Sequence, residues 1–247
     1  MLKYIILGII QGITEFLPVS SSGHLVIIQK FIGVTEQAVV ISVVLHLGTS
    51  LALVIFFFKD ILNLLRNMRL LSYIIIVTLV TGIIGISGKG FFEKLFNSPR
   101  LVAVALIFTG IILILTRKFM EKKRSALNIK DALILGLTQG FAIIPGISRS
   151  GITISTLLFR GLDREMSFRF AFLVAIPAVF GAAILEAKDI SLACNLDAGN
   201  LIIGFIVSLL TGILSLRILK IVLGKAKLHY FGYYCIIIAV ITLLFVK

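Results

Sequence analysis

Long apolar runs separated by short charged loops make up most of this chain. In the first half, the runs cover about residues 41–58, 71–87 and 101–116. Each comes close to the roughly 17–25 apolar residues that a transmembrane helix needs. A basic loop from Arg117 to Lys130 follows, and the pattern then starts again. The sequence therefore predicts an all-helical integral membrane protein.

The N-terminal apolar segment, residues 1–33, carries polar and helix-breaking residues at its centre. It reads Q-G-I-T-E-F-L-P-V-S-S-S-G-H from Gln11 to His24. Proline removes a backbone hydrogen bond, and the polar groups that it frees need partners inside a membrane. We therefore predict two short half-helices that meet at Pro18–Gly23, forming a re-entrant hairpin rather than a complete span.

The second half of the chain repeats motifs of the first half in the same order and at nearly constant offsets. The pairs are Leu7-Gly8 and Gln11-Gly12 with Leu135-Gly136 and Gln139-Gly140, Pro18 and Ser22-Gly23 with Pro145 and Ser150-Gly151, Lys59-Asp60-Ile61 with Lys188-Asp189-Ile190, and Thr81-Gly82-Ile83 with Thr211-Gly212-Ile213. Ordered echoes of this kind indicate duplication. We predict one membrane domain over residues 1–247 with repeat halves 1–127 and 128–247, each holding one re-entrant hairpin and three transmembrane helices.

An odd number of spans in each half means that the second half crosses the membrane in the opposite direction, as in an inverted-topology repeat. The loops 59–70, 117–130 and 217–229 together hold thirteen Lys and Arg residues, whereas 88–100 and 186–200 hold four. Because basic loops favour the cytoplasm, we expect the first three loops inside and both termini outside.

Composition agrees with a membrane protein and narrows the classes of partner. Apolar residues make up 59% of the chain, charged residues only 14%, and the mean hydropathy is +1.15. Soluble domains are about 45–50% apolar and about 25% charged. The excess of basic residues suits anionic lipid headgroups, and no aromatic-interleaved basic stripe indicates nucleic acid. Cys194 and Cys235 lack the spacing of a metal site, and we expect unpaired thiols.

Polar side chains gather at the first predicted helix break. Gln11 and Glu15 are four residues apart and therefore share one helix face. An ionisable residue at membrane depth costs roughly 2.5–3.5 kcal/mol, so Glu15 needs a partner or a wet cavity. His24 follows three serines, and histidine is the usual base for a serine nucleophile. The serines could equally satisfy backbone groups freed by Pro18, and Glu15 could merely cap a broken helix.

The second motif, P-G-I-S-R-S-G-I-T over Pro145 to Thr153, supplies a fixed positive charge. Arg149 lies between two serines, and a guanidinium matches the geometry of a phosphate through paired hydrogen bonds. A helix that starts near Ser150 would add the positive end of its dipole. Arg149 could alternatively form a structural pair with Glu15. We predict that the two motifs meet in the membrane around a phosphate.

Together the two motifs closely resemble the undecaprenyl-diphosphate phosphatases, the bacitracin-resistance membrane enzymes. The resemblance covers both motifs, the length and the repeat, and it marks a set of site residues: Gln11, Glu15, Ser21, His24, Ser148, Arg149 and Thr153. Gln11 stands where other members have Glu, which leaves one carboxylate fewer. The resemblance also implies a divalent cation, Mg²⁺ or Ca²⁺, and a site that opens to the outer, periplasmic side of the bacterial inner membrane.

We therefore predict hydrolysis of undecaprenyl diphosphate to undecaprenyl phosphate and inorganic phosphate, which recycles the lipid carrier for cell-wall synthesis and confers bacitracin resistance. Arg149 would stabilise the transferred phosphoryl group, and Ser21 would be the nucleophile. His24 would act as base or leaving-group acid, and Glu15 would orient a serine or water or hold the metal. The residues that would bind the substrate's phosphates are Gln11, Ser20, Ser22, Ser148, Ser150 and Thr153. Covalent catalysis and direct attack by water both stay open.

A lipid-phosphate or anion transporter built on the same inverted repeat is the alternative, because broken helices at the midplane also suit carriers. The crowding of Glu15, three serines and His24 favours the enzyme, since binding alone needs less acid–base chemistry. We expect a polyprenyl diphosphate and membrane lipids as partners, expect no nucleic acid, and leave a homodimer open. His46 and His229 have no comparable polar neighbours, and we interpret His46 as structural.

Overall fold

The structure is a computed structural model that describes residues 1–31, 38–64, 66–96, 98–121, 124–187 and 197–245. Within these ranges the chain is helical, and strand-type pairing is limited to an isolated bridge between Arg124 and Leu162. The elements in order are α1 (Leu2–Phe16), α2 (Ser21–Phe31), α3 (Ala38–Phe56), α4 (Phe58–Leu64), α5 (Met68–Ser87), α6 (Lys89–Phe96), α7 (Pro99–Leu115), the 3-10 helix η1 (Thr116–Phe119), α8 (Ile129–Phe141), α9 (Arg149–Phe159), α10 (Arg164–Ala187), α11 (Ala198–Gly224) and α12 (His229–Phe245). The predicted all-helical class is confirmed.

Four of the described helical stretches are long and apolar enough to cross a membrane: Met68–Ser87, Pro99–Phe119, Arg164–Ala182 and Ala198–Gly224. A fifth arises if α3 and α4 are counted as one span, although their axes differ by 69°. The last helix, α12, is apolar but shorter. The chain is therefore a multi-pass membrane protein. The bend after α3 and the short helix α6 were not predicted from the sequence.

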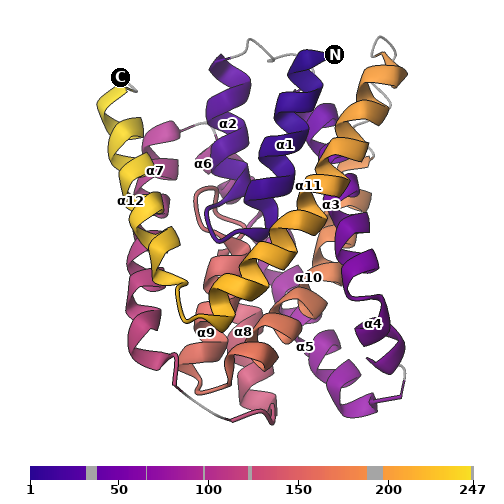
Figure 1. The fold of residues 1–247 in the computed structure, drawn as a ribbon, viewed down its shortest axis with the longest axis vertical. Coiled ribbons are helices and arrows are strands. Elements are labelled where there is room, and N and C mark those ends of the chain that lie inside the picture. Colours follow the sequence, from indigo (N-terminus) through magenta and orange to yellow (C-terminus); the bar gives the residue numbers. More distant parts are fainter. Residues whose placement is uncertain (32–37, 65, 97, 122–123, 188–196, 246–247) are drawn as a thin grey trace.

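Two helix hairpins, α1–α2 and α8–α9, run into the molecule from opposite ends (Figure 1). Both predicted helix breaks are present, since α1 ends before Pro18 and α8 ends before Pro145. The turn of the first hairpin packs against the start of α9: a Cβ added to Gly151 would lie 3.2 Å from Cβ of Pro18. Gly146 in the second turn has φ +94°, and a Cβ there would lie 2.3 Å from the carbonyl oxygen of Val102. Only glycine fits that position without strain.

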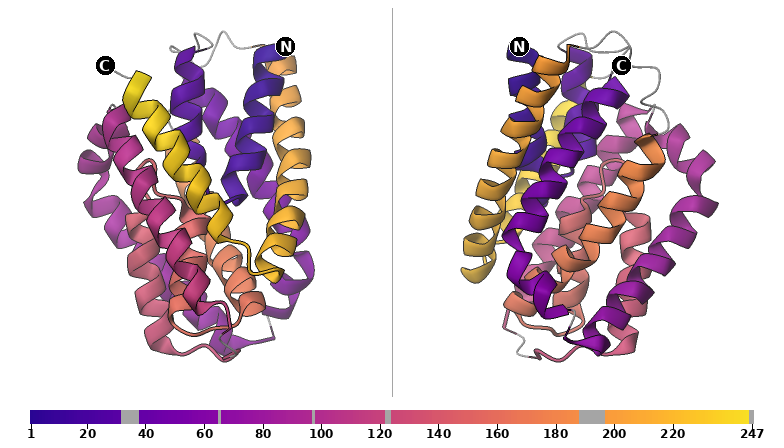
Figure 2. Two further views of the ribbon diagram at one scale, coloured as in Figure 1. Left: turned by 60° about the vertical axis from the view of Figure 1, so that its left-hand side comes forward. Right: turned by 90° about the vertical axis from the view of Figure 1, so that its right-hand side faces the viewer.

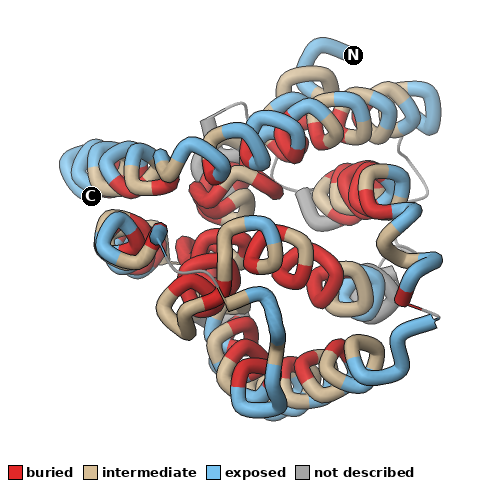
Figure 3. Tube along the Cα trace, turned by 60° about the horizontal axis from the view of Figure 1, so that its bottom comes forward, coloured by how far each residue is buried: buried red, intermediate tan, exposed pale blue. Residues whose placement is uncertain are grey.

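The remaining helices surround the hairpins. Helix α1 packs along α11, which also packs against α3, while α8 packs along α5 and α7 packs along α12. Both chain termini lie at the same end of the molecule (Figures 1 and 2). Helix α9 is buried on every side, with Ile154, Leu157 and Leu158 fully inaccessible. Figure 3 shows buried turns toward the centre and exposed turns outside. The exposed residues include many large apolar ones, such as Ile83, Leu210 and Ile237, as expected of a helix bundle in lipid.

At the end opposite to the termini, a buried carboxylate fixes the connection between α7 and α8. Asp131 is fully buried and accepts hydrogen bonds from both terminal nitrogens of Arg124, at 2.8 and 3.0 Å, and from Nε of Arg160 at 2.9 Å. Asp131 and Asn128 also form a capping box at the start of α8. Burial raises the pKa of Asp131, but the hydrogen bonds from Arg124, Asn128 and Arg160 prevail and hold that pKa below its ordinary value.

We expect Asp131→Asn to lower the free energy of unfolding by about 3 kcal/mol at neutral pH, because it leaves two guanidinium groups without their carboxylate. Because the pKa of Asp131 is lower in the folded protein than in the unfolded chain, its carboxylate stabilises the folded state at pH values above the unfolded-state pKa. This stabilisation is lost as the pH falls through the folded-state pKa. The difference between wild type and variant should therefore shrink in acid. Unfolding in detergent measures it, with Glu121→Gln, an exposed acid of the same loop, as control. A similar loss in the control would contradict this role for Asp131.

Candidate functional site

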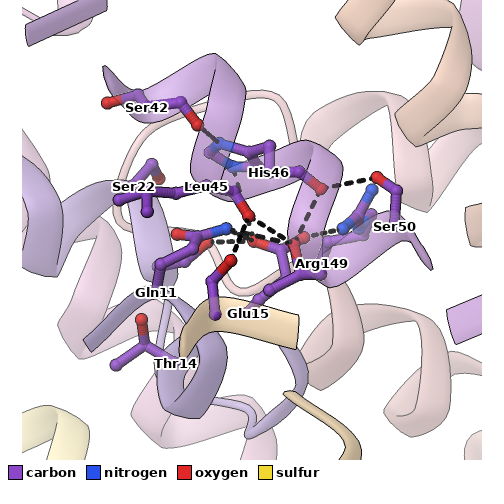
Figure 4. A network of polar contacts seen from close by, with 12 residues as sticks. Gln11, Thr14, Glu15, Ser22, Ser42, Leu45, His46, Ser50 and Arg149 are labelled. Carbon is purple, nitrogen blue, oxygen red and sulfur yellow. Dashed lines mark hydrogen bonds and ion pairs between the residues drawn. The ribbon is translucent and has the colours of Figure 1, made fainter. Parts of the chain in front are cut away.

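Glu15 of α1 is the centre of a polar network in the apolar interior (Figure 4). Its Oε1 pairs with Nη2 of Arg149. Its Oε2 accepts a hydrogen bond from the Ser21 hydroxyl at 2.6 Å and another from Nε2 of Gln11 at 3.0 Å. Residues that are 134 positions apart in the chain thus share one carboxylate. The structure brings the acid and hydroxyl of the first motif into contact with the guanidinium of the second.

The two helix breaks put Ser21 and Arg149 where they are. Ser21 is the first residue of α2, and Arg149 is the first residue of α9. The backbone N–H groups at the start of a helix have no partners within it, and the helix dipole is positive there. Two helix N-termini therefore begin beside the same carboxylate, an arrangement that also suits an anionic ligand.

The other hydroxyls predicted for the site line these two helix starts. The Ser20 and Ser22 hydroxyls lie 3.3 Å apart, and the Ser148 and Ser150 hydroxyls lie 3.3 Å apart as well. The Ser148 hydroxyl caps α9 by accepting from N–H of Gly151 at 3.2 Å. Thr153 donates to the carbonyl oxygen of Arg149 at 2.7 Å. In this arrangement Ser148 caps α9, and the remaining hydroxyls contact one another or the backbone of their own helix start.

His24 is buried and uses both of its ring nitrogens. Nδ1 lies 2.8 Å from the carbonyl oxygen of Ser20, and Nε2 lies 2.8 Å from the hydroxyl of Tyr234 on α12. A carbonyl oxygen only accepts, so Nδ1 carries a proton, and in the neutral ring Nε2 then accepts from the tyrosine. The acceptor in contact with the Ser21 hydroxyl is Glu15 rather than His24. The predicted contact between His24 and a serine nucleophile is thus replaced by a hydrogen bond from Ser21 to the carboxylate.

The structure adds residues that the sequence reasoning did not place at the site. His46 of α3, interpreted as structural, has Nε2 at 3.5 Å from Oε2 of Glu15. Thr49, one turn further along α3, lies 3.5 Å from Nε2 of Gln11. The run H-L-G-T-S inside an apolar span was the available signal. Tyr234, the partner of His24, had no comparable signal because it stands among other tyrosines at a helix start.

The oxygen and nitrogen atoms around Glu15 can be compared with the ligands that the expected divalent cation needs. The described residues contain no group of three or more His, Cys, Asp or Glu side chains that could hold a metal by themselves. Oε1 of Gln11, next to Glu15, is buried without a hydrogen-bond partner, and such an orphan oxygen needs a donor or a cation. Mg²⁺ is usually held by one or two carboxylates plus phosphate oxygens. The residues therefore fit a cation that a phosphorylated ligand shares.

Comparison with known proteins gives a consistent result over the whole chain. The family model described as bacitracin resistance protein BacA matches residues 4–241. An undecaprenyl-diphosphatase of Halothermothrix orenii is 41% identical over 251 residues, covering 98% of this chain and 96% of that protein. Proteins of the same name from Carboxydothermus hydrogenoformans and Methanosphaera stadtmanae are 41% and 38% identical, covering 97% and 99% of this chain and 95% and 97% of their own lengths.

A double-mutant cycle tests the pairing of Glu15 with Arg149. Arg149→Leu alone leaves a buried carboxylate without its cation, and we expect a loss of about 3 kcal/mol in the free energy of unfolding. Glu15→Gln in the same protein should recover part of it, with a coupling of about 1–3 kcal/mol. The matched control is the more exposed pair of Asp60 and Arg169, where exposed pairs couple by about 1 kcal/mol or less. Equal coupling in both cycles would contradict the special position of Glu15.

Proposed function

Because this chain belongs to the bacitracin resistance protein BacA family, we propose that it is a membrane phosphatase acting on undecaprenyl diphosphate. It hydrolyses this lipid to undecaprenyl phosphate and inorganic phosphate. The reaction recycles the lipid carrier for cell-wall synthesis and confers bacitracin resistance. The observation that carries the proposal is the contact of Glu15 with both the Ser21 hydroxyl and the Arg149 guanidinium.

Phosphoryl transfer depends mainly on positioning and on neutralising charge. Arg149 binds Glu15 through Nη2, and its other N–H groups are suited to the oxygens of the terminal phosphoryl group. The Ser21 oxygen attacks the terminal phosphorus while its proton passes to Glu15. The bond from that phosphorus to the bridging oxygen breaks and releases undecaprenyl phosphate, and water then hydrolyses the phosphoserine. In a direct mechanism, Glu15 takes the proton from an attacking water that Ser21 orients.

A divalent cation, Mg²⁺ or Ca²⁺, belongs to the same proposal. The carboxylate of Glu15 and the orphan Oε1 of Gln11 are the oxygens that would hold it, together with phosphate oxygens. When bound, the cation neutralises negative charge on the diphosphate. Gln11 in place of a second carboxylate makes the protein's share of the donor set small, so the ligand's oxygens dominate the coordination.

A carrier for a lipid phosphate would also need Arg149 and two helix N-termini. It would not need a serine hydroxyl held at 2.6 Å from a buried carboxylate oxygen. Such a pair matches a nucleophile with its base, and a carrier gains nothing from it. This contact therefore favours the phosphatase over the transporter.

The proposal extends to an inverted repeat of halves 1–127 and 128–247 with re-entrant hairpins α1–α2 and α8–α9. Matching contacts support it. Thr211 donates to the carbonyl oxygen of Gly8 at 3.3 Å, and Thr81 donates to that of Gly136 at 3.2 Å. The two serine pairs described above are a second match. With the basic loops in the cytoplasm, the site opens to the outer face of the plasma membrane, the side of both termini.

We expect Ser21→Ala and Arg149→Lys each to reduce phosphate release by about 100-fold or more, because the first removes the hydroxyl on Glu15 and the second removes paired donors. The assay uses the detergent-purified protein, a polyprenyl diphosphate and Mg²⁺, so that no gradient exists. Ser72→Ala, an exposed serine of α5, is the control. Full activity of Arg149→Lys would exclude bidentate clamping, and no release by wild type with any divalent cation would point to transport.

Removal of divalent cations tests the metal. We expect EDTA to stop phosphate release and added Mg²⁺ or Ca²⁺ to restore it. Gln11→Leu should raise the cation concentration that gives half-maximal activity, because it removes the orphan oxygen beside Glu15. Gln139→Leu, the matching buried glutamine of the second half, should leave that concentration unchanged. Turnover that persists in EDTA would remove the cation from the proposal.

A further inference from the structure

His46 of α3 faces the Glu15 carboxylate, on the oxygen that also accepts from Ser21 and Gln11 (Figure 4). Its Nδ1 lies 2.8 Å from the carbonyl oxygen of Ser42, one turn earlier in α3. Because this oxygen only accepts, Nδ1 is the donor there, and the contact fixes the direction of the ring. Nε2 is consequently directed toward Oε2 of Glu15, which also only accepts when ionised. Because a neutral imidazole carries one N–H and Nδ1 uses it, Nε2 can donate toward Glu15 only as part of a doubly protonated, positively charged ring. In that form, His46 presents an N–H donor and a positive charge to the site.

The backbone that carries His46 is held in place by α11. A Cβ added to Gly48 would lie 2.1 Å from the Ser208 hydroxyl oxygen and 2.5 Å from the carbonyl oxygen of Phe205, so the two helices are in close backbone contact. The Ser208 hydroxyl also donates to the carbonyl oxygen of Leu45 at 3.0 Å. His46 therefore presents Nε2 from a fixed position, as a preorganised binding group requires.

The His46–Glu15 distance and the exposed fractions of the side chains indicate that His46 and Arg149 are accessible to a ligand, whereas Glu15 lies buried behind them. The His46 Nε2 to Glu15 Oε2 distance of 3.5 Å is longer than a good hydrogen bond, so the N–H is not fully used. The side chains of His46 and Arg149 are 29% and 24% exposed, whereas that of Glu15 is 4% exposed. A ligand that enters the site meets the imidazole and the guanidinium before it meets the carboxylate.

We propose that His46 is a second substrate-binding residue, whose Nε2–H donates to a non-bridging oxygen of the diphosphate. Arg149 and His46 then hold the phosphates from the two sides of Glu15, and the carboxylate behind them stays bonded to the Ser21 hydroxyl. The division of labour leaves His24, which is tied to Tyr234, out of phosphate binding. This inference rests on the proposed function and adds His46 of α3 to the residues that bind its substrate.

The test compares wild type with His46→Phe, which keeps the ring shape but lacks the donor, and with His46→Gln, which restores an N–H at similar reach. Hydrolysis of a polyprenyl diphosphate is measured in detergent at saturating divalent cation. We expect His46→Phe to raise KM about tenfold or more, the loss of one hydrogen bond to a charged group, with a smaller change in kcat. His46→Gln should return KM close to wild type. His229→Phe, a histidine remote from the site, is the control.

An unchanged KM in His46→Phe, or a loss confined to kcat, would overturn the binding role. A His46→Gln protein as poor as His46→Phe would also overturn it, because the donor would then not be what matters. If His46→Phe fails to fold, His46→Leu takes its place, and folding is checked by thermal unfolding.

Binding of labelled farnesyl diphosphate to Ser21→Ala protein, with and without His46→Phe, separates this inference from the proposed reaction. If wild type releases no phosphate but binding weakens about tenfold without the His46 donor, the reaction is wrong and the inference stands. If binding does not depend on His46, the inference fails whatever the turnover.

Discussion

A carboxylate buried among apolar helices must have partners, because leaving it ionised and alone costs far more than a small membrane protein can spare. Glu15 meets this constraint with a guanidinium on one oxygen and a hydroxyl and an amide on the other. Each partner comes from a different part of the chain or a different turn. The demand of one charge for neutralisation therefore fixes how the two helix hairpins approach each other.

The hairpins provide what unbroken helices could not. A continuous helix satisfies its own backbone and offers no N–H groups to a ligand, whereas a helix that starts inside the molecule exposes its first turn. The cost is a set of freed polar groups at the break. Side chains of neighbouring helices satisfy part of this set: Thr109 of α7 donates to the carbonyl oxygen of Gly146, and the Cys235 thiol of α12 lies 3.5 Å from that of Pro18. Helices α7 and α12 thus support opposite turns.

Much of this arrangement could be predicted from the sequence. The parts that could not be predicted were missed for one common reason, their dependence on tertiary contacts. Helix breaks follow from proline and clustered polar residues, and the meeting of the two motifs followed from an acid and an arginine that each needed a partner. His46 was missed because its distance from Glu15 depends on how α3 packs on α11, a contact between segments more than 150 residues apart. The bend between α3 and α4 and the pairing of His24 with Tyr234 likewise depend on tertiary contacts. The tract around Cys194 and the Lys188-Asp189-Ile190 echo lie outside the described residues.

The proposed repeat also explains why a symmetric framework gives an asymmetric site. Ser21 and Arg149 are the first residues of α2 and α9, and in the proposed repeat these are equivalent positions that a two-fold relation between the halves would place opposite each other. Chemistry then requires that they differ, because two arginines or two serines facing one carboxylate would lack either the nucleophile or the charge. Gln11 and Gln139 are both buried and each keeps an unpartnered Oε1, but Glu15 has only Ile143 as its counterpart. One half therefore supplies the acid and the hydroxyl on it, while the other supplies the fixed positive charge.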